Sequence, residues 1–128
     1  GLLKEGELMD YYVTFLAGIF RSVRFGASSA HGKANMVRFN YFNKHHAFTR
    51  NSDGTYTVNL EKMKNAIQGL SSLILQLQGD GDKEKVMELM ANEGIIPENL
   101  QKDLDRLSSK DIPVDIIFEQ GLKVLGLN

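Results

Sequence analysis

Residues 59–79 read NLEKMKNAIQGLSSLILQLQG and contain the clearest periodic pattern of the chain. Its apolar side chains recur at alternating steps of three and four residues, which places them on one face of an α-helix. They are Leu60, Met63, Ile67, Leu70, Ile74 and Leu77. Because Asn59 is a favourable N-cap and Gly79 suits a helix end, the stretch predicts an amphipathic helix that packs against other elements.

Two further helices are predicted before this one. At residues 7–23 the apolar positions again step by three and four, and the breadth of the stripe indicates a largely buried helix. They are Leu8, Tyr12, Phe15, Ile19 and Val23, with Tyr11, Leu16 and Phe20 beside them. Ser28 or Ser29 can cap the next helix, which runs from residue 30 to about residue 46 with no Pro and one Gly.

The remaining elements are shorter. β-Prone residues at 48–50 and 55–58 flank Asn-Ser-Asp-Gly and predict a hairpin. Short helices are expected after Asp82 and after Pro97, together forming a helical hairpin. At 114–121 the sequence VDIIFEQG favours a strand, with a helix end as the alternative. We therefore expect residues 1–128 to form a single, mainly α domain of about five helices, with a short β-hairpin and a C-terminal strand.

Composition narrows the function classes. The chain has 128 residues with 15 Lys and Arg against 16 Asp and Glu, so it offers no basic field for nucleic acid. The most apolar run, residues 11–20, is too short to span a bilayer, and no membrane contact is expected. The absence of cysteine fits a reducing compartment, and we expect a cytoplasmic location. The start Gly-Leu-Leu-Lys, without Met, suggests a piece cut from a longer protein.

Residues 27–34, ASSAHGKA, come within one residue of a phosphate-binding loop. Ala34 stands where the pattern requires Ser or Thr, and the preceding segment has helical spacing where a phosphate-binding loop follows a strand. A nucleotide site is therefore disfavoured. His31, Asn35 and Arg38 instead share one helix face, so that their polar groups could receive an anionic or carbonyl ligand near a helix N-terminus. In the structural alternative, His31 satisfies a neighbouring backbone group and Arg38 is solvated.

The sequence contains no complete metal or catalytic site. His31, His45 and His46 are the three histidines and lack the spacing of a helical zinc site. The acidic segment 79–84 lacks the glycine and the bidentate Glu of a calcium loop, so it is interpreted as a helix-linking turn. We expect no metal ligands and no cofactor within this chain.

Four segments, however, resemble the C-terminal part of bacterial dipeptidyl peptidase III. They are RSVRFGASSAHGKANMVRFNYF at 21–42, AFTRNSDGTYTV at 47–58, LILQLQGDGD at 73–82 and IPVDIIFEQG at 112–121. Members of that family are two-lobed zinc exopeptidases that release dipeptides from peptide N-termini. Their zinc-binding motifs, His-Glu-x-x-Gly-His and a later Glu-Glu pair, do not occur in this sequence.

The resemblance implies a C-terminal piece of the helical, zinc-bearing lobe, inactive alone. Its partners would be the remainder of the parent peptidase and a peptide substrate. The family's Ala-His pair beside the zinc site matches Ala30-His31, which assigns His31 a catalytic and substrate-binding role. Animal members have an Arg four residues later, where this chain has Asn35, so Asn35 would bind substrate through a neutral hydrogen bond. Their C-terminal Arg-Lys pair has no match in residues 111–121.

Two alternatives stay open. The chain could be a stand-alone helical interaction domain, with an exposed partner surface that includes Tyr11, Tyr12, Phe15 and Phe20, and with a structural His31. The parent could also be a catalytically inactive relative of the peptidase. The sequence upstream of Gly1 would decide between a peptidase and a non-enzyme.

Overall fold

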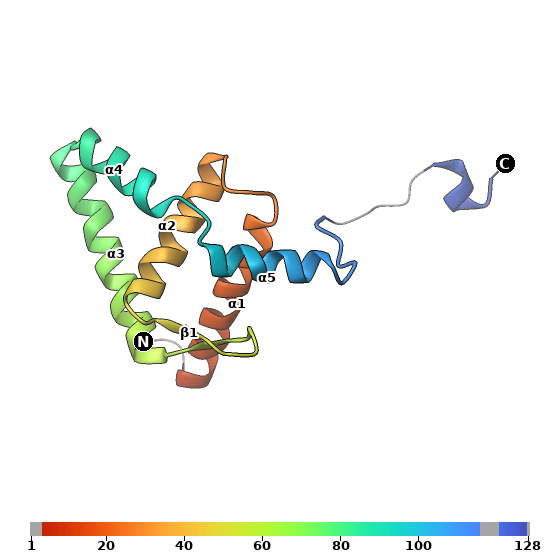
Figure 1. Cartoon of the computed structure of the whole chain (residues 1–128), viewed down its shortest axis with the longest axis horizontal. Coiled ribbons are helices and arrows are strands. Elements are labelled where there is room, and N and C mark those ends of the chain that lie inside the picture. The colour runs from red at the N-terminus through yellow and green to blue at the C-terminus, as the bar shows by residue number, and fades with distance from the viewer. Residues whose placement is uncertain (1–3, 116–120, 128) are drawn as a thin grey trace.

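The computed structural model describes residues 4–115 and 121–127, which form five α-helices, a two-stranded hairpin and a short 3-10 helix (Figure 1). The elements are α1 (Glu5–Val23), α2 (Ala30–Lys44), β1 (Phe48–Arg50), β2 (Tyr56–Val58), α3 (Leu60–Asp80), α4 (Lys83–Glu93), α5 (Glu98–Ser108) and the 3-10 helix Leu122–Leu125. The predicted mainly helical fold with one hairpin is confirmed. The strand predicted at 114–121 falls mostly on residues 116–120, outside the described residues.

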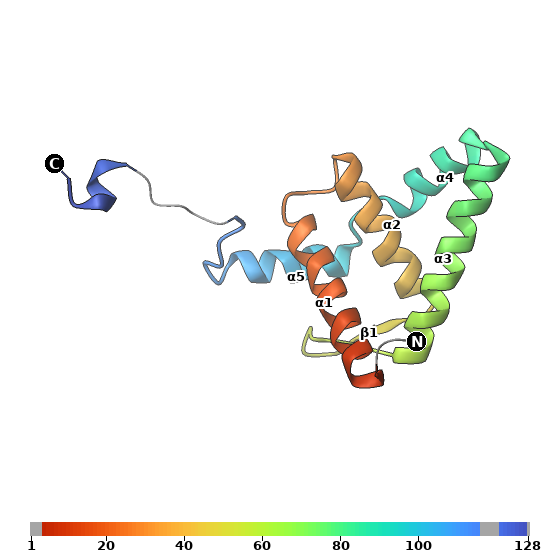
Figure 2. The ribbon, with the colours of Figure 1, turned by 180° about the vertical axis from the view of Figure 1, so that it is seen from behind.

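Helix α2 is the central element, and α1, α3 and α4 all pack against it (Figures 1 and 2). Its apolar side chains meet buried residues from α1, from the hairpin and from the first half of α3 in one core. The fully buried members include Met36 of α2 and Met63 of α3. The core therefore fixes α2 firmly, which matters because α2 carries the candidate site residues.

Helix α1 is less buried than its sequence predicts. Leu16, Ile19 and Val23 are buried, but Tyr11 is 61% exposed and Phe15 39% exposed. Helix α3 runs alongside α2 and diverges from α1 (Figure 2). Part of the aromatic face of α1 is therefore left uncovered. The prediction of a largely buried helix at 7–23 was wrong for that reason.

Helix α2 ends at Lys44, two residues before its predicted end. His46 takes a left-handed conformation, with φ of 54°. The backbone N–H of Ala47 donates to Phe42 O and that of His46 donates to Asn43 O, which together form a Schellman C-cap. This cap terminates the helix and turns the chain directly into β1.

The two strands pair antiparallel, with Arg50 opposite Tyr56. A two-stranded ribbon needs outside support, and α5 supplies it. Arg106 of α5 donates hydrogen bonds of 2.8 Å to the backbone oxygens of Asp53 and Gly54 in the turn. The hairpin is thereby held against a helix that lies about fifty residues later in the sequence.

Helices α4 and α5 do not form the predicted helical hairpin. Helix α4 packs against α2 and α3, whereas α5 lies toward the β-hairpin (Figure 1). Asn40 of α2 explains the separation, because its amide donates to the backbone oxygens of Glu93 and Ile95 at 2.8 and 2.9 Å. These bonds fix the segment between α4 and α5 to α2, so that α5 does not fold back against α4.

Candidate functional site

The candidate site is the face of α2 that begins at His31. Ser29 caps the helix, and its Oγ accepts a 3.0 Å hydrogen bond from the Gly32 N–H. A Cβ at Gly32 would lie 2.5 Å from Gly26 O and 2.8 Å from the Ala27 Cα, so only glycine admits this close approach of the preceding loop. The space beside Gly32 is therefore filled by the chain's own preceding loop.

His31 lies in the first turn of α2 with its side chain exposed. Its ring makes no hydrogen bond to any residue that the structure describes, so the structural alternative, in which His31 satisfies a backbone group, is not observed. Because Ser29 and Gly32 fix the backbone on either side, the ring projects from a well-anchored turn. Such a ring can donate or accept a hydrogen bond without first breaking an internal one.

Asn35 and Arg38 are brought together as the helical spacing predicts. The Asn35 amide donates a 2.7 Å hydrogen bond to Ser22 Oγ of α1, and its oxygen accepts a 2.9 Å bond from Arg38 Nη1. Asn35 is half-buried and Arg38 is exposed. The three side chains form a short relay across the α1–α2 contact. Sequence reasoning missed Ser22, which lies 13 residues before Asn35.

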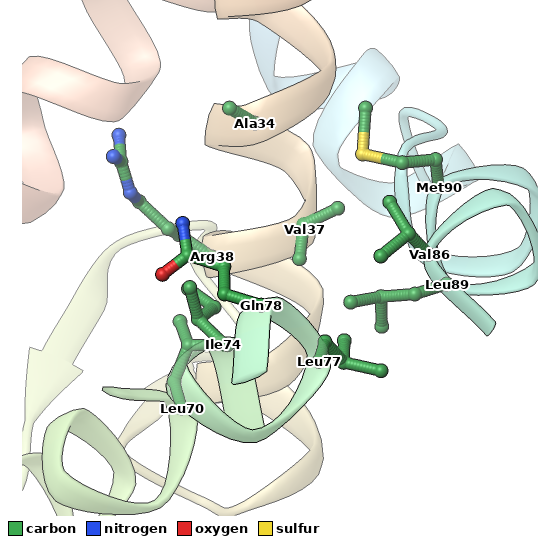
Figure 3. A pocket seen from close by; sticks show the side chains of 10 residues that line it. All are labelled: Ala34, Val37, Arg38, Leu70, Ile74, Leu77, Gln78, Val86, Leu89 and Met90. Carbon is green, nitrogen blue, oxygen red and sulfur yellow. The ribbon is translucent and has the colours of Figure 1, made fainter. Parts of the chain in front are cut away.

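Two apolar hollows adjoin Arg38. The first hollow, of about 240 Å³, lies between α2, α3 and α4 (Figure 3). The second hollow, of about 470 Å³, lies between α1, α2 and α3. The first is lined by Ala34, Val37, Arg38, Leu70, Ile74, Leu77, Gln78, Val86, Leu89 and Met90, and the second by Tyr11, Tyr12, Phe15, Arg38, Phe42, Ile67, Leu70, Ser71 and Ile74. The Arg38 guanidinium points away from Val37 and Leu89 (Figure 3).

The aromatic face of α1 contributes to the second hollow only in part. Tyr11, Tyr12 and Phe15 line it, as the alternative of an exposed partner surface requires. Phe20 does not belong to that surface. Its ring stacks edge-on against Phe39 and Tyr56, with centroid distances of 5.8 and 4.8 Å, and packs against the core.

A second polar cluster, which the sequence did not reveal, joins the hairpin to α5. Asp103 is 4% exposed and accepts two 2.8 Å bonds from Arg50 and a 2.7 Å bond from the Tyr56 hydroxyl. The Arg50 hydrogen bonds hold the pKa of Asp103 below its ordinary value, while burial raises the pKa of Tyr56 and the Asp103 bond adds to that shift. The carboxylate is fully engaged, so the cluster is structural. The sequence signal that could have indicated this cluster is Asp103, a charged residue that lies between the leucines of α5.

The described residues do not fit a zinc site. Among them, no group of three His, Cys, Asp or Glu side chains could hold a metal ion. His45 lies against the ring of Tyr41, with centroids 4.2 Å apart. Asp82 caps α4 by accepting a 3.0 Å bond from the Lys85 N–H, as the helix-linking interpretation of the acidic turn predicts.

Comparison with solved structures identifies the fold. Over 83% of its length the chain superposes on dipeptidyl-peptidase III from Corallococcus sp. strain EGB, with a TM-score of 0.77 and 40% sequence identity. The chain resembles part of bacterial dipeptidyl peptidase III in both sequence and fold. The enzyme from Caldithrix abyssi matches 82% of the chain, with a TM-score of 0.76 and 38% identity. The chain spans 19% and 20% of those two dipeptidyl peptidase III chains. The resemblance inferred from the four sequence segments is confirmed.

A curated relative carries a different name. Nudix hydrolase 3 of Arabidopsis thaliana is 40% identical over 116 residues, which are 91% of this chain and 15% of that protein. The name describes a protein of which this chain covers a small part, whereas the dipeptidyl peptidase III matches also rest on the fold. No family model matches the sequence. Within residues 4–115 and 121–127, no helix has the length and apolarity needed to cross a membrane.

Proposed function

We propose that this chain is the C-terminal part of the helical lobe of a dipeptidyl peptidase III-like zinc exopeptidase, and that it is inactive alone. The observation that carries the proposal is the match in sequence and fold to two bacterial dipeptidyl peptidase III structures over more than four-fifths of the chain. Zinc would be held by the remainder of the protein, since the described residues offer no ligand group. A cytoplasmic location belongs to the same proposal.

In this proposal His31 is the catalytic and substrate-binding residue of the chain. Its exposed ring would donate a hydrogen bond to the carbonyl oxygen of a bound peptide and strengthen that bond as negative charge develops on the oxygen. The Ser29 cap and the Gly32 contact with the preceding loop support this role because they fix the turn that presents the ring. A donor that is already oriented loses little freedom when the reaction proceeds.

Asn35 would contact the substrate through a neutral hydrogen bond. Its amide has a second N–H besides the one that bonds Ser22, and that N–H could donate to a peptide carbonyl. Its oxygen is engaged by Arg38, which holds the amide in one orientation. A substrate contact at Asn35 would therefore be weaker and less dependent on salt than an ionic contact with an arginine.

A second candidate function is an interaction domain or an inactive relative. The different hydrolase name of the Arabidopsis protein favours keeping this alternative, because similar segments, about 40% identical to this chain, occur in proteins with different names. Under this alternative the apolar hollows would bind a partner and His31 would have no chemical role.

Replacing the matched part of Corallococcus dipeptidyl-peptidase III with this chain tests the proposal. We expect the chimaera to release dipeptides from a peptide N-terminus and to lose that activity on zinc removal. Single amino acids or no product would contradict the proposal. The chain alone is the control, and it should release nothing.

A further inference from the structure

The two hollows form one apolar surface on the molecule. They share Arg38, Leu70 and Ile74, so the surface continues from α1 across α2 to α4. Several of its large apolar side chains are exposed, among them Tyr11, Phe15, Ile74 and Val86. A contiguous apolar surface of this kind is typical of a binding interface. The hollows are open and flanked by helices, which suits a protein segment better than a small ligand, because small-ligand sites enclose most of their ligand.

Arg38 gives this surface one positive charge. Its guanidinium pairs with no carboxylate among the described residues, and neither hollow is lined by an acidic side chain. The guanidinium is oriented by a single hydrogen bond that Arg38 Nη1 donates to Asn35 Oδ1, and Asn35 is itself held by Ser22. The other guanidinium donors stay available. A desolvated arginine in an apolar surrounding is stabilised by a carboxylate that binds it through two hydrogen bonds.

We propose that this surface binds an amphipathic helix from the remainder of the parent protein, which places apolar side chains in the two hollows and a carboxylate on Arg38. The proposal rests on the proposed function, because the helix would come from the part of the parent that this chain does not cover. The chain spans a fifth of the dipeptidyl peptidase III chains it matches, so most of such a protein remains to pack against it. Helix-in-groove packing with apolar anchors is a common way to fill such a surface.

Two proteins are compared in the test, namely this chain alone and the Corallococcus chimaera. Arg38→Met removes the charge and keeps an apolar stem, whereas Arg38→Lys keeps the charge and loses the planar fork. Arg21→Met is the matched control, because Arg21 is an exposed arginine of α1 that lines neither hollow. Thermal unfolding midpoints are measured for every variant in both proteins.

We expect Arg38→Met to change the midpoint little in the chain alone and to lower it by several degrees in the chimaera, where Arg38→Lys restores part of the loss. Equal effects of Arg38→Met and Arg21→Met in the chimaera would overturn the proposal, and so would a chimaera that does not fold while the chain alone does. Activity separates the two proposals. A chimaera that shows the Arg38 effect but releases no dipeptide contradicts the proposed function alone, and an active chimaera without the Arg38 effect contradicts the docking alone.

Discussion

Arg50 and Asp103 are 53 residues apart in sequence, yet Nε and Nη2 of Arg50 each donate a 2.8 Å hydrogen bond to the Asp103 carboxylate. The Tyr56 hydroxyl donates a third bond to the same group. These contacts tie both strands of the hairpin to α5. The hairpin connects the end of α2 to the start of α3, so the cluster stabilises the end of the molecule where α2 ends and α3 begins.

Asp103→Ala should destabilise the chain by about 2–4 kcal/mol, because it leaves the Tyr56 hydroxyl and the partly covered guanidinium of Arg50 without their partner. Urea unfolding at neutral pH measures this change. Asp105→Ala is the matched control, since Asp105 lies on the same helix and accepts one exposed hydrogen bond from Gln101. Its cost should stay below about 0.5 kcal/mol. Similar losses of stability in the two variants would contradict the stabilising role assigned to the Asp103 cluster.

The stability of the chain should fall in acid through Asp103. Its pKa in the folded chain lies below the ordinary value of 3.8, because Arg50 donates hydrogen bonds to the charged carboxylate. The unfolded state therefore takes up a proton first, so this stabilisation is complete above the ordinary pKa and is lost as the pH falls through the folded-state pKa. Denaturant midpoints measured from pH 6 downward should decline, and the decline should be shallower in Asp103→Ala. Parallel curves would contradict the assignment.

The chain should also lose stability at alkaline pH through Tyr56. Burial raises its pKa above the ordinary value of 10.0, and the hydrogen bond to Asp103 adds to the shift. The unfolded tyrosine ionises first as the pH rises, so the contribution of Tyr56 is complete below pH 10 and is lost above it. Ultraviolet titration of the tyrosinate signal should show an ionisation above the ordinary tyrosine pKa of 10.0. Tyr56→Phe identifies the signal by removing it.

Gly32→Ala should destabilise α2 by about 1–3 kcal/mol, because the new methyl group would collide with the backbone at Gly26 and Ala27. Gly18→Ala is the control. Gly18 lies within α1 with nothing within 4 Å of an added Cβ, so alanine there should stabilise by about 0.5–1 kcal/mol. Thermal unfolding of the two variants should thus shift in opposite directions. A neutral Gly32→Ala would mean that the loop before α2 is not held as described.

The local elements were predictable from sequence because their signals are local. Ser29 and Asn59 cap their helices as expected, with the side-chain oxygen of Asn59 accepting from the Lys62 N–H at 3.0 Å. The apolar spacing of residues 60–77 likewise gave the helix α3, whose observed end at Asp80 lies one residue beyond the predicted one. The shared face of Asn35 and Arg38 also follows from spacing alone.

Relations between distant residues were not predictable. Nothing in the spacing of α5 indicates that Asp103 meets Arg50, and nothing near Asn35 indicates that Ser22 accepts its hydrogen bond. The exposure of Phe15 could not be foreseen either, because it depends on the angle at which α3 leaves α1. For His31, spacing placed the ring near a helix N-terminus, and its catalytic role remains a prediction.

The most direct test is the rate of dipeptide release by the Corallococcus chimaera with His31→Ala. His45→Ala is the control, because His45 is also exposed but lies at the far end of α2. Our account predicts that His31→Ala lowers kcat by a factor of about 10²–10³, the range seen when one oxyanion donor is removed. Thermal unfolding should be unchanged, since the ring makes no described hydrogen bond. Equal turnover in the His31→Ala and His45→Ala chimaeras would contradict the central claim.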